Sequence, residues 1–167
     1  MKLENPKGFS GLELIASTAI LSLISLVVLS VFMVTQVIWT DSITNVKLQN
    51  AAKKPMQAMI KELKEADPAS PIGITISPDQ KTITFAVPQT TSASAITAWT
   101  QVSFAFDAAT GNITRTAAAS SIIGQQITGT TFSKSGNLIT VALTATDTTA
   151  NGKSLSTTIT SQAAMRK

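Results

Sequence analysis

A single carboxylate, Glu13, is the one charged side chain in an apolar stretch that covers residues 12–34. A charge inside a membrane-spanning segment is costly, so such a residue usually has a partner of opposite charge and a function. The chemistry that Glu13 offers is therefore ion pairing with a cation. Gly8 and Phe9 stand shortly before it, and the short head that precedes them carries Lys2 and Lys7 against Glu4.

The composition removes most catalytic chemistry. The chain has no cysteine and no histidine, which excludes disulfides, thiol nucleophiles, imidazole bases and the usual transition-metal ligands. Serine and threonine are abundant, but no base stands at a spacing that would activate one as a nucleophile. We expect no enzyme, no catalytic residue, no bound metal and no cofactor.

Four isolated aspartates raise the alternative of a calcium site. None of them shows the Asp-x-Asp type of spacing that a calcium loop uses. Aspartate is also a common residue in turns, because its side chain bonds to the backbone two residues on. We interpret these residues as turn residues: Asp67, Asp79, Asp107 and Asp147.

The net charge of +4 is small, and the lysines are scattered along the chain. A nucleic-acid interface needs a basic patch or stripe, so we do not expect nucleic acid as a partner. The length of 167 residues has room for one membrane-anchoring helix and one further domain of about 100 residues.

The element that positions Glu13 is a helix long enough to cross a membrane. The 23 residues from 12 to 34 would span roughly 35 Å, against a hydrocarbon core of about 30 Å. Trp39 follows where an aromatic anchor at the far interface would lie. Lysines precede the span and Asp41 is the first charge after it, which places the N-terminus in the cytoplasm and the C-terminal part outside.

Three other interpretations of this segment are less consistent with it. A secretory signal peptide has an apolar region of about 7–15 residues followed by a small-residue cleavage site, and here the apolar run is longer and no such site follows. A lipoprotein would need a cysteine. A plain membrane anchor fits the length but leaves Glu13 unexplained.

The N-terminus resembles the processing signature of type IV prepilins and pseudopilins. The shared features are the basic head, Gly8-Phe9, the glutamate at the fifth place after the glycine, and the uninterrupted apolar run behind it. The resemblance implies that residues 1–8 are a leader, that prepilin peptidase cuts between Gly8 and Phe9, and that Phe9 is then N-methylated. It also implies that Glu13 pairs with the terminal amine of a neighbouring subunit. Ser30 stands where the major pilins often have a helix-kinking proline, which favours a minor pilin or pseudopilin.

The helix is expected to continue beyond the span. We expect residues 9–39 to form the membrane and filament-core part and residues 40–66 an amphipathic continuation. An apolar stripe of helical period supports the second part and is interpreted as packing against a sheet: Met56, Met59, Ile60 and Leu63. Pro55 removes a backbone bond, so a kink or a short break is expected there. Asp67-Pro68 predicts the end of the helix near Ala66.

Residues 72–167 are expected to form an antiparallel β domain, which makes the fold class α+β, pilin-like. Apolar and polar residues alternate in several segments, as in Ile83, Phe85 and Val87, and this indicates one buried and one polar face. Six or seven strands are predicted, near residues 73–76, 81–87, 99–107, 112–117, 125–132, 138–146 and 154–161. Residues 90–95 and 117–121 are predicted to be loops of small residues.

Two later segments loosely resemble the J-type minor pseudopilins and related minor pilins. These are the hairpin of residues 102–115 and the final pair of strands. The family resemblance implies a structural subunit of a type IV pilus, a type II secretion pseudopilus or a DNA-uptake apparatus, in a tip complex that starts assembly. Its partners would be prepilin peptidase, other pilins or pseudopilins and an inner-membrane assembly platform. The alternative is a membrane-tethered binding domain that recognises a surface or ligand through residues 89–98 or 117–124.

Overall fold

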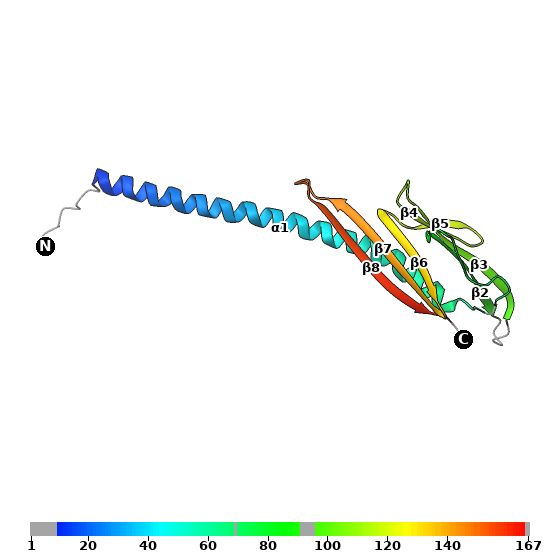
Figure 1. The fold of residues 1–167 in the computed structure, drawn as a ribbon. Coiled ribbons are helices and arrows are strands. Elements are labelled where there is room, and N and C mark those ends of the chain that lie inside the picture. Colours follow the sequence, from blue (N-terminus) through cyan, green and yellow to red (C-terminus); the bar gives the residue numbers. More distant parts are fainter. Residues whose placement is uncertain (1–9, 69, 91–95, 166–167) are drawn as a thin grey trace, which may run out of the picture. The chain divides into compact units, whose positions relative to one another are not determined.

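The computed structural model describes residues 10–68, 70–90 and 96–165. The first element is one helix, α1 (Gly11–Glu65), of 55 residues, and every later element is a strand (Figure 1). By contacts the chain divides into two compact units, Met1–Thr40 and Asp41–Lys167, and α1 contributes to both. The fold class is α+β, as predicted.

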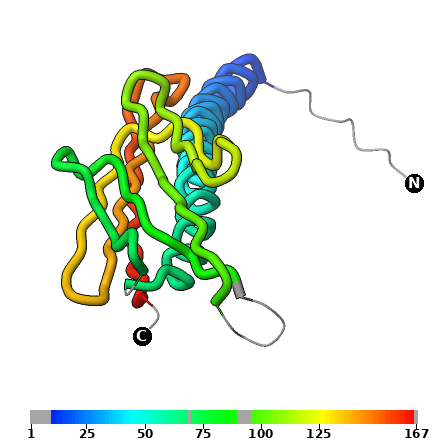
Figure 2. The backbone as a smooth tube through the Cα atoms, turned by 90° about the vertical axis from the view of Figure 1, so that its right-hand side faces the viewer, coloured from blue at the N-terminus to red at the C-terminus, as the bar shows by residue number. Residues whose placement is uncertain are grey.

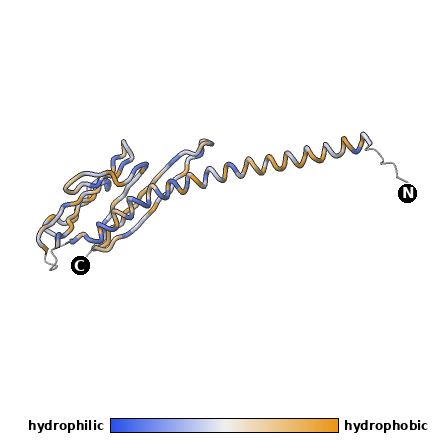
Figure 3. Tube along the Cα trace, turned by 180° about the vertical axis from the view of Figure 1, so that it is seen from behind, coloured by the Kyte–Doolittle hydropathy of each residue, from blue (hydrophilic) through white to orange (hydrophobic). Residues whose placement is uncertain are grey.

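In the first unit, none of the described helix residues is buried. The side chains of residues 12–34 are exposed, and this part of the tube is predominantly apolar in Figure 3. Among the described residues, α1 is the one helix that is long and apolar enough to cross a membrane. The criterion is the length and the apolar composition of the helix, and a signal-like segment near the N-terminus meets it as well.

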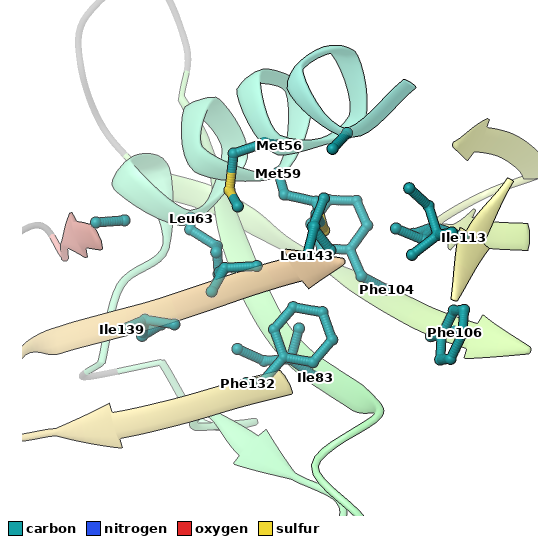
Figure 4. Close-up of a cluster of buried hydrophobic side chains, with 14 of the residues drawn as sticks. Met56, Met59, Leu63, Ile83, Phe104, Phe106, Ile113, Phe132, Ile139 and Leu143 are labelled. Atoms are coloured by element: carbon teal, nitrogen blue, oxygen red, sulfur yellow. The ribbon is translucent and has the colours of Figure 1, made fainter. Parts of the chain in front are cut away.

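In the second unit one face of α1 is buried. The buried positions recur every three or four residues, as an amphipathic helix requires: Thr44, Leu48, Ala52, Pro55, Met56, Met59 and Leu63. The predicted stripe is therefore confirmed as core at Met56, Met59 and Leu63, and its fourth member, Ile60, is partly buried against that core. Figure 4 shows Met56, Met59 and Leu63 directed from the helix towards strand side chains such as Leu143 and Ile139.

Pro55 lies inside the helix, which runs unbroken from Gly11 to Glu65, so the expected break is absent. The tertiary contact explains why. Pro55 is buried, and it packs against strand β5 (Ser120–Gly124) at Gly124, where an added Cβ would lie 2.9 Å from the Cβ of Pro55. The absence of a side chain at Gly124 makes room for the proline ring, and this burial offsets the lost helical hydrogen bond.

We expect Gly124→Ala to lower the free energy of unfolding by about 1–3 kcal/mol, because the added methyl group overpacks the contact with Pro55. Gly129→Ala is the matched control, since its Cβ would meet Thr144 at an ordinary 3.6 Å. Urea unfolding of the full chain in detergent micelles measures both. Equal stability of the two variants would show that the Pro55 contact is not tight.

The strands form two antiparallel sheets, and Figure 2 follows the chain through them. The five-stranded sheet has the order β1-β2-β3-β4-β5 and the three-stranded sheet the order β6-β7-β8. Besides β5, the strands are β1 (Thr75–Ile76), β2 (Thr82–Thr90), β3 (Ile96–Asp107), β4 (Asn112–Thr116), β6 (Ile127–Ser135), β7 (Leu138–Thr148) and β8 (Ser154–Ala164).

The two sheets adjoin along β6. The backbone N–H of Phe132 donates to the carbonyl of Gln80 at 3.0 Å, and that of Ile127 donates to the carbonyl of Gly111 at 3.0 Å. Gly111 has a φ of +68°, and a Cβ there would lie 2.9 Å from the carbonyl oxygen of Ile127. Only glycine fits this turn without strain, because the turn needs both a left-handed backbone and a close backbone contact.

The predicted alternation is confirmed on β3 and β7. Val102, Phe104 and Phe106 are buried on β3, and Ile139, Val141 and Leu143 are buried on β7. On β2 the alternation is broken by Ala86, which was expected on the polar face and is buried. The N–H of Asp67 donates to the carbonyl of Ala86 at 3.3 Å, so the segment that follows α1 lies against β2 here.

Two expectations about the strands were wrong. The described residues contain eight strands instead of six or seven, and the missed one is β5. Residues 120 and 121, predicted to lie in a loop, pair instead with Thr116 and Arg115 of β4. Of the other predicted loop, Thr90 belongs to β2, and residues 91–95 lie outside the described residues.

We expect a fragment of residues 41–167 to fold on its own, because the buried core lies within this unit. A fragment of residues 66–167 is the control, since it lacks the helical core residues Leu48, Met59 and Leu63 and should not fold. Circular dichroism during thermal unfolding distinguishes a cooperative transition from a gradual one. Gradual unfolding of the longer fragment would contradict the assignment of an independent unit.

Candidate functional site at the N-terminal end of the helix

Glu13 lies in the first turn of α1, and its carboxylate bonds to the backbone just before the helix. The N–H of Ser10 donates to Oε2 of Glu13 at 3.0 Å. The carbonyl of Ser10 in turn accepts from the N–H groups of Glu13 at 3.0 Å and Leu14 at 3.2 Å. Ser10 therefore holds the N-cap position with glutamate three residues later, and the carboxylate satisfies one N–H that the helix leaves free.

The cap gives Glu13 a local role that the sequence reasoning missed. Ser10-Gly11-Leu12-Glu13 has the S-x-x-E spacing of a capping box, a signal that was present in the sequence. A carboxylate near a helix N-terminus is also favoured by the helix dipole. The cap hydrogen bond leaves the negative charge in place, so Glu13 remains able to pair with a cation from another molecule.

Gly8 and Phe9, the residues predicted to flank the cleavage site, lie outside the described residues. The order of the chain still places the Gly8–Phe9 bond immediately before the N-cap of α1.

The hydroxyl groups in the span bond back to the preceding turn of their own helix. Ser17 Oγ donates to the carbonyl of Glu13 at 2.7 Å, and Ser25 Oγ donates to the carbonyl of Leu21 at 2.8 Å. Thr18, Ser22 and Ser30 make equivalent bonds. This pattern lowers the cost of placing hydroxyls in lipid, and it makes the apolar surface of residues 12–34 compatible with a membrane or with other helices.

Two of the four aspartates considered for calcium, Asp79 and Asp107, bind turn residues instead. Asp147 was also expected in a turn, but it lies in β7 and its Oδ1 accepts from the N–H of Thr148 at 2.8 Å. Asp79 accepts from the Ser77 hydroxyl and from the N–H of Lys81, and these bonds, the Ser77 bond first, lower the pKa of its carboxyl group. Asp107 accepts from Thr110 Oγ1 at 2.7 Å and from the N–H of Ala109, which likewise lowers its pKa. Within the described ranges no three metal-ligating side chains come together.

Two ion pairs in the second unit link α1 to strand β4 and to the turn before β8, and sequence reasoning identified neither. Nε of Arg115 on β4 lies 2.7 Å from Oε1 and 3.0 Å from Oε2 of Glu62, and both side chains are half-buried. Nζ of Lys153, just before β8, lies 2.8 Å from Oδ2 of Asp41. Both pairs join residues far apart in the sequence, so no local pattern could have shown them.

Comparison with known proteins finds no matching family model, no matching curated protein and no matching solved structure. The architecture itself is pilin-like, because a long apolar N-terminal helix packs, through its second half, on antiparallel sheets. A specific family and a specific function therefore rest on the N-terminal residues and on this architecture.

Proposed function

We propose that this chain is a minor pilin or pseudopilin, a structural subunit that enters a helical filament through its N-terminal helix. The observation that carries the proposal is the lone carboxylate of Glu13 in the first turn of α1, four residues after Phe9, at the start of the exposed apolar surface of residues 12–34. A surface of this kind needs lipid or other helices to cover it, and its single charge needs a cation.

In this account the protein is first stored in the inner membrane as a single-pass protein with its C-terminal domain outside the cytoplasm. Prepilin peptidase removes residues 1–8, and Phe9 becomes the methylated N-terminus. The assembly platform then transfers the helix from lipid into a bundle with other pilins or pseudopilins. The chain acts as a building block, with no catalytic step of its own and no nucleic acid as a partner.

A membrane-tethered binding domain is the second candidate, and the Glu13 cap is the observation that favours it. The hydrogen bond from Ser10 accounts for a glutamate at this position without any neighbouring subunit. The two loops considered for ligand binding offer less support. Most of residues 117–124 form β5, and residues 89–90 and 96–98 belong to β2 and β3.

The experiment that tests the proposal is intact-mass analysis of the protein from cells with and without active prepilin peptidase. We expect a mature form that begins at Phe9 and carries one added methyl group, and we expect it only in cells with the peptidase. An unchanged N-terminus in both strains would contradict the proposal and support the tethered domain.

A further inference from the structure

Strand β8 presents a long free edge. It lies at the end of the three-stranded sheet, and within the described residues its one neighbour is β7 (Figure 1). The pairing with β7 runs from Thr148↔Ser154 to Leu138↔Ala164 with no shift of register. In an antiparallel strand every second residue turns its N–H and C=O away from the neighbour. The other side of β8 therefore carries a regular row of backbone donors and acceptors.

Within the described residues, this edge lacks three features that often protect a sheet from pairing with another strand. Ser154–Ala164 contains no charged residue, no proline and no bulge. The five-stranded sheet ends in β1, which has two residues, and in β5, which has five and whose pairing is shifted between Ile113 and Thr114. On β6 the outer side bonds to the carbonyls of Gln80 and Gly111.

The inward face of β8 is also incompletely covered. Leu155 and Ile159 pack against the core but remain partly exposed. On the adjacent strand β7, Ile139, Val141 and Leu143 have no exposed surface. A strand added beside β8 would extend the sheet and cover the exposed parts of Leu155 and Ile159, which is favourable for apolar surface.

The charge at the start of β8 is already paired. Lys153 precedes the strand, and its ammonium group lies 2.8 Å from the carboxylate of Asp41. Within the part of the chain that the structure describes, the edge from Ser154 to Ala164 thus presents hydroxyls, an amide and apolar groups and carries no charge of its own. A segment that pairs here needs no charge of its own, and a buried charge in it would lack a partner.

We propose that β8 is a docking strand for an extended, uncharged segment of a different subunit, with apolar side chains at alternate positions that cover Leu155 and Ile159. The inference rests on the proposed function, because it assigns the partner surface of the β domain within the same assembly. The mode is strand addition, in which backbone hydrogen bonds supply affinity and alternate side chains supply specificity.

Two ways of pairing a second copy of this chain with the edge are unfavourable. Pairing β8 with itself in antiparallel fashion places a two-fold axis perpendicular to the sheet. Residues 44–63 of α1 lie along the sheet face, so this axis would reverse the helix direction, whereas helices stored in one membrane and assembled in one filament run parallel. Pairing β8 with β5 of another copy joins 11 residues to five across a shifted register.

Hydrogen–deuterium exchange resolved to single amides tests the proposal on the full chain. The mature protein in detergent micelles is compared with the same protein purified in its assembled complex. We expect every second amide of β8 to exchange about tenfold more slowly in the complex, or slower still, while the amides bonded to β7 change little. Unchanged exchange along the whole of β8 in the assembled protein would overturn the proposal.

A pair of variants provides a second test. Thr157 is half-buried on the inward face of β8, whereas Thr160 is exposed on the opposite face. Thr157→Lys places an inward-pointing charge on the edge, a feature that blocks strand addition, and should reduce the amount of protein in the complex at least tenfold. Thr160→Lys should assemble as the wild type does, and equal assembly of the two variants would contradict the docking strand.

The outcomes separate this inference from the proposed function. If wild-type protein is matured and assembled but β8 stays unprotected, the docking strand is wrong and the subunit role stands. If the wild-type protein is never matured after Gly8, both are wrong. If Thr157→Lys lowers folding stability in micelles, poor assembly of this variant has another cause. The hydrogen–deuterium exchange of wild-type β8 then tests the docking strand by itself.

Discussion

Glu13→Lys should abolish incorporation of the mature protein into the filament while leaving it inserted in the membrane. Cleavage after Gly8 creates a positive amine at Phe9, four residues before Glu13 in the sequence. A neighbouring subunit shifted along the filament axis can bring its amine beside Glu13. At about 4 Å and an effective dielectric constant near 20 the attraction is about 4 kcal/mol before desolvation, and lysine turns it into a repulsion.

Glu13→Gln is the control that separates the charge from the helix cap. Glutamine at this position can still accept the hydrogen bond from the N–H of Ser10, as in a capping box, but it carries no charge. Glu13→Ala loses both the charge and the cap. If ion pairing matters, Gln and Ala should both assemble poorly and Lys worst. If capping alone matters, Gln should assemble as the wild type does.

Cell fractionation measures this series, with the mature protein quantified in the membrane and in the sheared filament fraction. All variants should appear in the membrane and lose residues 1–8, because the apolar span and the Gly8–Phe9 bond are unchanged. Wild-type incorporation of Glu13→Lys would exclude ion pairing at Glu13 as the interaction that sets the axial register of the subunit.

Gly8→Leu should block removal of the leader almost completely. A peptidase must bring its catalytic groups against the backbone at the cut, and glycine has no side chain to obstruct that approach. The precursor should then accumulate in the membrane with residues 1–8 attached and should not assemble. Intact-mass analysis of the membrane fraction measures the ratio of precursor to mature protein.

Gly11→Ala is the matched control for this variant. Gly11 is the first residue of α1, beyond the proposed cut, and an added Cβ there meets no atom within 4 Å. It should mature as the wild type does. Normal maturation of Gly8→Leu would contradict cleavage at this bond, whereas a defect in both variants would indicate a general effect on the N-terminal segment.

The parts of the fold that follow from a regular apolar period could be predicted. The helix and its buried stripe at Met56, Met59 and Leu63 follow the helical period, and β3 and β7 follow the alternation of strands. The end of α1 at Glu65 lies one residue before the predicted end, because Asp67-Pro68 disfavours the helical backbone there.

The missed features depend on packing between distant residues. β5 contains two serines followed by two adjacent isoleucines, so it shows no alternation, and Ile122 remains exposed. The helix passes through Pro55 because Gly124, far along the chain, leaves space for the ring. Local propensity predicts a break at such a proline, and the tertiary contact overrides it.

The candidate site at Glu13 could be predicted in part from the cost of a charge in lipid, without any regular apolar period. The lone charge in an apolar run identifies Glu13 without any structure, because lipid makes such a charge costly. The cap from Ser10 has a separate local signal, the S-x-x-E spacing of residues 10–13. A neighbouring subunit's amine belongs to another chain, and no residue within this sequence encodes where it lies.

On assembly, the apolar surface of residues 12–34 should leave lipid and pack against the helices of other subunits. Leu26 lies in the middle of that surface with 68% of its area exposed, so a photo-reactive amino acid placed there reports directly on what covers the helix. After illumination, the sheared filament fraction should contain the mature chain cross-linked to another pilin-type subunit, and cells without prepilin peptidase should give membrane-bound chain without such a product. Absence of the subunit cross-link in cells that process and assemble pilins, with the chain confined to the membrane fraction, would contradict the account.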